Sequence, residues 1–324
     1  MKKLHYIALG VITVMVSSTV AQAACTWKPE RAVTYVIPWG AGGGTDANSR
    51  VLASMLQEKF GVPFNPVNRT GGNGVVGHSA IATADPDGYT IGSATVEITM
   101  MSHLGITKLN QSNITPIALV DIVPAAVFVG KESPFKTLKD VLDYAKKNPG
   151  KLTASGAAQG GIWHLALAGL LQSSGLPADA IRWVPSEGAA PALQELIAGG
   201  VDVATPSLSE GKALVEAGEI RALAVMNPER LSALPNVPTT KEAAGTDWSM
   251  SAFITVSGPE GLPKEIQCSY EKAVLDIFNT KKWADFKVSR GSEVVKMGSA
   301  DLTKMLTQTY DRLGAAMKAV GVAK

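Results

Sequence analysis

The stretch VTYVIPWGAGGGTDANSR, Val33–Arg50, combines the features of a strand, a loop and a helix start. Its first five residues are mostly β-branched or aromatic, which is typical of a buried β-strand. A proline and a tryptophan follow, and Gly40–Gly44 then contains four glycines. Thr45 suits an N-cap and Asp46 suits the first turn of a helix, so this stretch predicts that a helix begins here.

This glycine-rich loop has the composition of an anion-binding site. Backbone N–H groups at a helix start point toward a ligand, and glycines let the ligand come close because they lack a Cβ. Each hydrogen bond to a charged group contributes about 1.5–3 kcal/mol, so several amides hold a carboxylate without a cationic side chain. We predict that the following residues bind a carboxylate: Trp39, Gly40, Ala41, Gly43, Gly44, Thr45 and Asp46.

For two of these residues, a purely structural role is an alternative to ligand binding. Asp46 either complements the helix dipole or accepts a hydrogen bond from a bridging water, a ligand hydroxyl or a ligand amine. Trp39 either forms a wall of the pocket beside an apolar ligand body or belongs to the ordinary core. The residues alone leave both alternatives open.

A second glycine-rich loop, 69–78, follows a predicted strand at Phe64–Asn68 and merges into an alanine-rich helix. Asp85–Gly88 is a turn signal before a third predicted strand at Tyr89–Ser93. This alternation of strands and helices indicates an α/β fold with a largely parallel sheet, whose ligands sit beyond the carboxyl ends of the strands. Further candidate ligand-binding residues are therefore Gly72, Asn73, Gly74 and Thr95. A left-handed turn conformation is an equal interpretation for the asparagine.

The middle of the chain repeats this pattern. A third glycine-rich loop, Gly156–Gly161, separates a predicted strand at Leu152–Ser155 from a helix at Ile162–Gln172. Because the helix start also favours an anion, this region is expected to meet the far end of the ligand. The candidates here are Ser155, Gln159, Gly160, Thr205 and Ser207.

Two apolar segments, Ile117–Val129 and Ile220–Met226, are predicted to cross between two domains. The first domain is then discontinuous and comprises residues 24–122 and 227–324, and the second comprises residues 123–226. Two crossings between domains permit hinge closure. Further helices are predicted at Thr137–Lys147, Gly188–Ala198, Glu210–Ala217, Lys264–Phe278 and Ala300–Ala319.

The N-terminus has the pattern of a secretory signal peptide. Lys2 and Lys3 precede an uncharged apolar run, and the small residues at 21–23 fit a cleavage site after Ala23. The run is too short for a confident membrane span, so we expect an exported, periplasmic protein. A lipid anchor on Cys25 is disfavoured because Gln22 stands where a lipid-attachment box requires leucine.

Cleavage leaves about 300 residues, enough for two domains. It also leaves 28 basic residues against 28 acidic ones, and this balance predicts no nucleic-acid partner. Two cysteines, Cys25 and Cys268, remain in an oxidising compartment, which favours a disulfide over two buried thiols.

Enzymatic interpretations fit less well. Gly42, Gly44 and Ala47 match a dinucleotide-binding pattern, but the second strand ends without the acidic residue that binds ribose. A phosphate-binding loop fails because His78 replaces the required lysine. There is no G-x-S-x-G sequence, and the four histidines are scattered. We therefore expect no enzyme, cofactor or metal ion.

Several ordered blocks make the chain resemble the solute receptors of tripartite tricarboxylate transporters, also called Bug-type or TctC-like periplasmic binding proteins. These blocks are residues 38–46 with Arg50, 68–74, 85–90, 148–152, 155–164, 199–203 and 234–239. The resemblance implies a two-domain Venus-flytrap fold, type II-like, with two crossover strands. It also implies a monomeric receptor for a small organic acid that is delivered to integral-membrane permease subunits.

In that family, the two loops corresponding to residues 38–46 and 69–74 hold a carboxylate through backbone amides and bridging waters. Residues near Ser155–Gly161 and Thr205–Ser207 would then choose the rest of the ligand. Trp39 and the segment Ala157–Gln159 depart from the usual family pattern, and this alters the expected pocket shape. Tricarboxylates, dicarboxylates, amino acids and aromatic acids all remain open as ligands. Presentation of the closed form to a sensor kinase is an alternative to transport.

Overall fold

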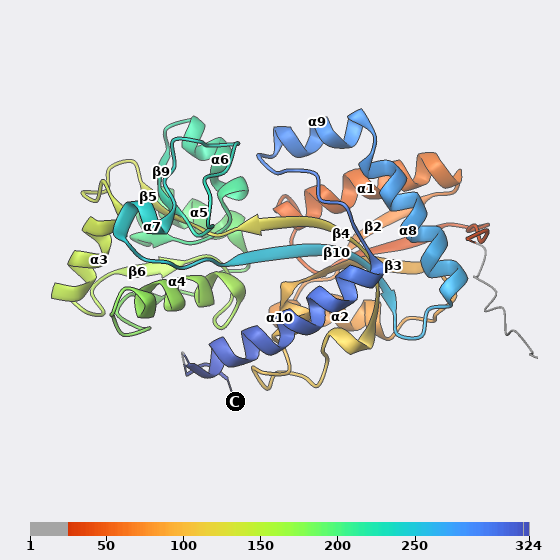
Figure 1. Ribbon diagram of the computed structural model, residues 1–324, viewed down its shortest axis with the longest axis horizontal. Coiled ribbons are helices and arrows are strands. Elements are labelled where there is room, and N and C mark those ends of the chain that lie inside the picture. The colour runs from red at the N-terminus through yellow and green to blue at the C-terminus, as the bar shows by residue number, and fades with distance from the viewer. Residues whose placement is uncertain (1–24, 320, 324) are drawn as a thin grey trace, which may run out of the picture.

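The computed structural model describes residues 25–319 and 321–323, which form two lobes, each built on one β-sheet (Figure 1). The predicted signal peptide and its cleavage site lie outside these residues. Within the described part of the chain, no helix is long and apolar enough to cross a bilayer.

The first lobe contains a six-stranded sheet. Its strands are β1 Val33–Ile37, β2 Phe64–Asn68, β3 Thr90–Thr95, β4 Ile114–Pro124, β10 Ser251–Pro259 and β11 Met297–Gly298. They lie in the order β11-β4-β10-β3-β1-β2. The helices of this lobe are α1 Gly44–Phe60, α2 Val75–Ala82, α8 Lys264–Phe278, α9 Lys281–Ser289 and α10 Ser299–Ala319, with 3-10 turns η1 Gly72–Gly74, η2 Val96–Thr99 and η3 Gln111–Asn113.

The second lobe contains a five-stranded sheet in the order β7-β6-β8-β5-β9. Its strands are β5 Ala126–Gly130, β6 Thr153–Ser155, β7 Arg182–Trp183, β8 Val203–Ala204 and β9 Ile220–Val225. Its helices are α3 Leu138–Lys147, α4 Ile162–Ser173, α5 Ala189–Ile197, α6 Leu208–Glu216 and α7 Thr240–Ala244.

The sheets are more mixed than predicted. Strand β1 pairs in parallel with β2 and β3, and β6 pairs in parallel with β7 and β8. Strand β10, however, runs antiparallel between β3 and β4, and β5 runs antiparallel to β8 and β9. The physical reason is that β4 leaves the first lobe and β10 returns to it, so the two connecting strands run in opposite directions (Figure 1).

The return crossing lies later in the chain than predicted. The segment Ile220–Met226 is not the second crossover, because β9 is the edge strand of the second sheet. The chain stays with that lobe afterwards: the Val225 amide donates to the Pro238 carbonyl, and α7 packs on α3. The crossing comes at Met250, whose carbonyl accepts from the Ala125 amide and whose own amide donates to the Met226 carbonyl. The second lobe thus extends beyond the predicted boundary at residue 226.

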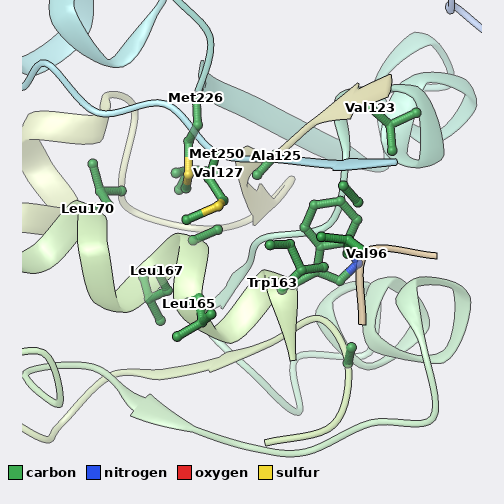
Figure 2. Close-up of a cluster of buried hydrophobic side chains, with 14 of the residues drawn as sticks. Val96, Val123, Ala125, Val127, Trp163, Leu165, Leu167, Leu170, Met226 and Met250 are labelled. Carbon is green, nitrogen blue, oxygen red and sulfur yellow. The ribbon is translucent and has the colours of Figure 1, made fainter. Parts of the chain in front are cut away.

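Apolar side chains bury the region where the two crossings meet. Met226, Met250 and Ala125 gather there above the leucines of α4, as Figure 2 shows. Trp163, 6% exposed, lies close to Val96 of the first lobe in the same buried cluster. The hydrophobic core is therefore continuous between the two lobes beside the crossings.

A disulfide joins Cys25 to Cys268 of α8, with 5.2 Å between the Cα atoms. It fixes the first described residue to the first lobe across a sequence separation of 243 residues. Nearby, the Trp27 ring packs against Tyr270 and Tyr89. The start of the chain is thus held both covalently and by aromatic contacts.

Replacing both cysteines by serine is expected to lower the free energy of unfolding by about 2–5 kcal/mol, because a very long loop then gains entropy in the unfolded state. Urea denaturation of the Cys25→Ser, Cys268→Ser protein, with and without a thiol reductant, measures this. Reductant should destabilise only the unsubstituted protein. Equal stability of the two proteins would contradict the structural role of the bond.

Candidate functional site

A cavity of about 110 Å³ lies between the lobes. Its walls come from the first glycine-rich loop, the strands β4 and β10 where they cross, and the starts of helices α4, α5 and α6. Eight of the predicted ligand-binding residues line it: Trp39, Gly40, Ala41, Gly43, Gly44, Thr45, Thr95 and Ser207. Residues that the sequence marked as candidates in both lobes therefore line the same cavity.

The first loop presents the amino end of α1 to this cavity. The helix begins at Gly44 and its N-cap is Gly43, which has an extended backbone and no capping side chain. Thr45 is therefore in the first turn and is not the N-cap, contrary to the prediction. Because the first-turn N–H groups have no acceptor within the helix, they are available to an anion.

Asp46 holds this loop in shape. One carboxylate oxygen accepts from the Gly42 amide at 3.0 Å, and the other accepts from the Asn68 side-chain amide at 2.9 Å. Arg50 Nε donates to both oxygens at 2.9 and 3.0 Å. Burial opposes the charge, but these hydrogen bonds lower the pKa of Asp46 below its ordinary value. Asp46 is absent from the cavity lining, so its contacts give it the role of positioning the loop.

Trp39 and Thr95 are linked side by side on the cavity wall. The indole Nε1 of Trp39 donates to Thr95 Oγ1 at 3.0 Å, and this hydroxyl donates to Glu97 Oε2 at 2.6 Å. The indole plane is therefore fixed by a polar contact and not by packing alone. Of the two interpretations of Trp39, the structure supports the pocket wall.

His78, which excluded a phosphate-binding loop, has a structural role. Its Nδ1 lies 2.7 Å from the Gly74 carbonyl and its Nε2 accepts from the Thr95 amide at 2.9 Å. These partners require a neutral ring with the proton on Nδ1. Burial lowers the pKa of His78 to about 4, consistent with that state. The ring ties the second glycine-rich loop to the end of β3.

The predicted residues of the second loop lie beside the cavity and do not line it. Gly72, Asn73 and Gly74 form η1, and Asn73 has the left-handed backbone that the sequence allowed, with φ 55°. A Cβ on Gly161 would lie 3.8 Å from Asn73 Oδ1, so this loop approaches the start of α4 in the other lobe.

The remaining predicted residues of the second lobe are also outside the lining. Thr205 Oγ1 donates to the Trp163 carbonyl at 2.9 Å, and Ser155 is buried at the end of β6. The Gly160 amide donates to His164 Nδ1 at 3.0 Å, and Gln159 is exposed. The third glycine-rich loop thus closes on its own helix. From this loop only Ala157 lines the cavity, and the other contacts of the second lobe come from Ile162, Trp163 and the segments at the starts of α5 and α6.

Two glutamates that sequence reasoning missed face the cavity from opposite lobes. Glu210, in the first turn of α6, accepts from the Ser207 hydroxyl at 2.7 Å and from the Ser207 amide at 3.1 Å. Its carboxylate also lies against the loop of the first lobe, where a Cβ on Gly44 would be 3.4 Å from Oε1. Burial raises the pKa of Glu210, while hydrogen bonds from Ser207, the charge of Arg290 and the Gly44 amide oppose this.

Glu97 of the first lobe in turn contacts the start of α4 in the second lobe. It belongs to η2 of the first lobe, is 5% exposed and lines the cavity. Burial raises its pKa, as does repulsion by Glu210, whereas hydrogen bonds from the Thr95 hydroxyl and the Ile162 amide oppose the shift. Ile162 is the first residue of α4 in the second lobe. Glu97 therefore occupies the helix start that was predicted to meet the far end of the ligand.

Helix α9, which the sequence did not reveal, brings cationic groups to the site. Lys287 is fully buried and pairs with Asp121 of β4 at 2.5 Å. Arg290, at the C-cap of α9, lines the cavity, and it is the single cationic residue among the described lining residues. The segment KKWADFKVS is mainly polar, so no apolar periodicity marked it as a helix that packs on a core.

Comparison with known proteins agrees with this architecture. A family model for the tripartite tricarboxylate transporter family receptor matches residues 49–322. The chain belongs to this family of receptors. A UPF0065 protein encoded between tcbD and tcbE in Pseudomonas sp. strain P51 is 30% identical over 316 residues, covering 95% of this chain and 91% of the relative.

Solved structures of similar receptors share the fold. The periplasmic binding protein BugD has a TM-score of 0.84 and 26% identity, covering 91% of this receptor and 99% of that chain. R. palustris Rpa4515, solved with adipate, has a TM-score of 0.84 and 30% identity with the same coverage. The predicted two-lobe α/β fold of a periplasmic binding protein is thereby confirmed.

The raised pKa values of the two glutamates predict a pH dependence of the receptor's stability. Because the two glutamates keep protons in the folded state that the unfolded state loses above about pH 4.5, their contribution to the free energy of unfolding should fall as pH rises from there and level off above the raised values. The buried His78 and the half-buried His164, whose pKa values are lowered, act in the opposite direction, so the test compares the slope of each variant with that of the unsubstituted protein. Glu97→Gln should flatten this fall. Urea denaturation between pH 4.5 and 8 tests it, with the exposed Glu195→Gln as control. An unchanged slope in Glu97→Gln would refute the assignment.

Proposed function

We propose that this receptor binds a small organic acid in the cavity between its lobes, with a carboxylate held by the backbone amides of the first glycine-rich loop. The observation that carries the proposal is the start of α1, which has no side-chain cap from its own N-cap residue and faces the cavity in a loop fixed by Asp46. No side chain of the loop is cationic, so the amides and the helix dipole supply the positive potential.

A contact within the protein supports the assignment of this loop as a carboxylate site. The carboxylate of Glu210 lies against Gly44, and the Gly44 amide favours its charged form. A carboxylate thus already lies at the start of α1, and a ligand acid would use neighbouring amides of the same turn. The adipate in the similar Rpa4515 structure supports an organic acid as the ligand class.

The other walls suit an apolar ligand body. Trp39, Trp163 and Phe253 line the cavity together with several small aliphatic residues. Burying such a body contributes roughly 25 cal/mol per Å² of apolar surface, while a few polar groups fix its orientation. This combination of apolar walls and a few polar groups favours a compact organic acid over a fully polar ligand such as a sugar.

The two strands that join the lobes suggest how the ligand is delivered. A hinge at Ala125 and Met250 would open the cavity, and closure around the ligand would create the surface that a membrane permease recognises. Within this proposal the receptor is a periplasmic monomer, exported with cleavage near Ala23, and the permease belongs to a tripartite tricarboxylate-type transporter.

Substitution of Gly44 tests the carboxylate site. A Cβ at this position would lie at contact distance from Glu210, so the side chain of Gly44→Leu would cover the first-turn amides. Helix α1 is retained because leucine and alanine both form helices better than glycine. We expect Gly44→Leu to weaken carboxylate binding by about tenfold or more, the loss of one charge-assisted hydrogen bond, and Gly44→Ala to weaken it far less.

Thermal unfolding and calorimetric titration of ligand-stripped protein with di- and monocarboxylates and α-amino acids provide the measurement. An acid at 100 times its Kd should stabilise the receptor by about 2.7 kcal/mol. Ala217→Leu, an exposed position away from the cavity, is the control and should bind normally. If no carboxylate stabilises the protein while a neutral sugar does, the proposed function is wrong.

A further inference from the structure

The charges around the cavity do not balance. Glu97 is buried there and Glu210 is half-buried, and in the described part of the chain neither forms an ion pair with a lysine, arginine or histidine within 4.0 Å. Asp121 also lines the cavity, but Lys287 neutralises it. A third glutamate, the exposed Glu187, also lines the cavity, and Arg290 alone remains to oppose the three glutamates, so acidic groups outnumber basic ones around it.

Glu210 lies next to the amides proposed to bind the ligand carboxylate, and Glu97 lies close enough to Glu210 for the two charges to repel each other. Glu210 touches the loop at Gly44, and Glu97 is connected to Trp39 through the hydroxyl of Thr95. The two carboxylates therefore lie at the helix starts that face each other across the cavity, Glu210 at the start of α1 and Glu97 at the start of α4. A ligand bound here meets donors and acceptors within one small region.

The carboxylates keep capacity to accept more hydrogen bonds. Each oxygen has two lone pairs, and the hydrogen-bond partners of Glu97 and Glu210 among the described residues occupy only part of them. A third acceptor lies in the same cavity, because Oδ1 of the buried Asp121 has no hydrogen-bond partner among the described residues. These acceptors require donors, which a simple aliphatic acid does not have.

A second carboxylate on the ligand, next to the first, would be repelled by the two glutamates. Like charges in a buried site raise the free energy of the complex, and two carboxylates from opposite lobes already repel each other there. A primary ammonium group at the same position on the ligand would instead be attracted by both glutamates, because it has a positive charge and three N–H donors. It would also bridge the lobes, since Glu97 and Glu210 belong to different lobes.

Building on the proposed function, we propose that the ligand is an α-amino acid whose carboxylate binds the loop amides and whose ammonium group lies between Glu97 and Glu210. The short separation of the two charges in an α-amino acid matches the adjacency of the loop to Glu210 and of Glu210 to Glu97. The side chain of the amino acid then extends along the apolar wall that includes Trp163 and Phe253.

The test uses pairs of acids that differ only in the α-amino group: leucine and 4-methylpentanoate, phenylalanine and 3-phenylpropionate, glutamate and glutarate. Calorimetric titration of the ligand-stripped full receptor gives Kd for each. In the pair that fits the pocket, the amino acid should bind about tenfold or more tightly than its partner, because charge-assisted hydrogen bonds are gained.

The variants Glu97→Gln and Glu210→Gln keep the side-chain shape but remove the charge. Each should reduce the preference for the amino acid within the pair severalfold, because only the ammonium group gains from the negative charge that the variant removes. Glu195→Gln, an exposed glutamate away from the cavity, should change neither value.

Equal or tighter binding of the acids that lack the amino group would overturn this inference and still support a carboxylate receptor. An amino-acid preference that both glutamine variants retain would overturn the assignment of Glu97 and Glu210. Binding of none of the six acids would overturn the inference and would count against the proposed function as well.

Discussion

The carboxylate of Asp46 is the contact on which the proposed site depends. It binds an amide of its own loop, the guanidinium of Arg50 and the side chain of Asn68, and it thereby fixes the glycine-rich loop to two secondary-structure elements. Four glycines in five residues would otherwise cost much conformational entropy to order. Because Asp46 supplies this order from outside the cavity, no side chain of the loop itself caps α1, and its start faces the cavity, where Glu210 of the other lobe meets the Gly44 amide.

A second constraint comes from the carboxylates that pass between the lobes. Glu210 of the second lobe lies against the start of α1, and Glu97 of the first lobe is stabilised by the start of α4. Each helix dipole of one lobe thus favours a negative side chain of the other. These contacts join the lobes at the cavity where we propose that the ligand binds.

The sequence revealed the parts of the site that are local in the chain. The strand, the glycines and the polar helix start at 33–50 are neighbours, so their shared role could be inferred from spacing, and Lys264–Phe278 was predicted with the bounds of α8. Glu97 and Glu210 could not be found in this way. Nothing near either residue differs from an ordinary helix start, and Glu210 even has the capping-box position that a structural role would give it.

Arg290 and Lys287 were missed for a related reason. They come from a polar helix whose burial depends on the distant Asp121, and a buried lysine is improbable until its partner is known. The late return crossing at Met250 was missed because Ile220–Met226 is as apolar as a crossing strand, although it forms a sheet edge. Pairing between distant segments decided each of these features.

The most direct test of the account is a crystal structure of the receptor with its tightest-binding acid. The account predicts one ligand carboxylate within hydrogen-bond distance of the backbone amides of residues 41–45, in a cavity closed by both lobes. A ligand carboxylate that is instead bound by Arg290, or a ligand bound away from Trp39 and Gly44, would contradict it.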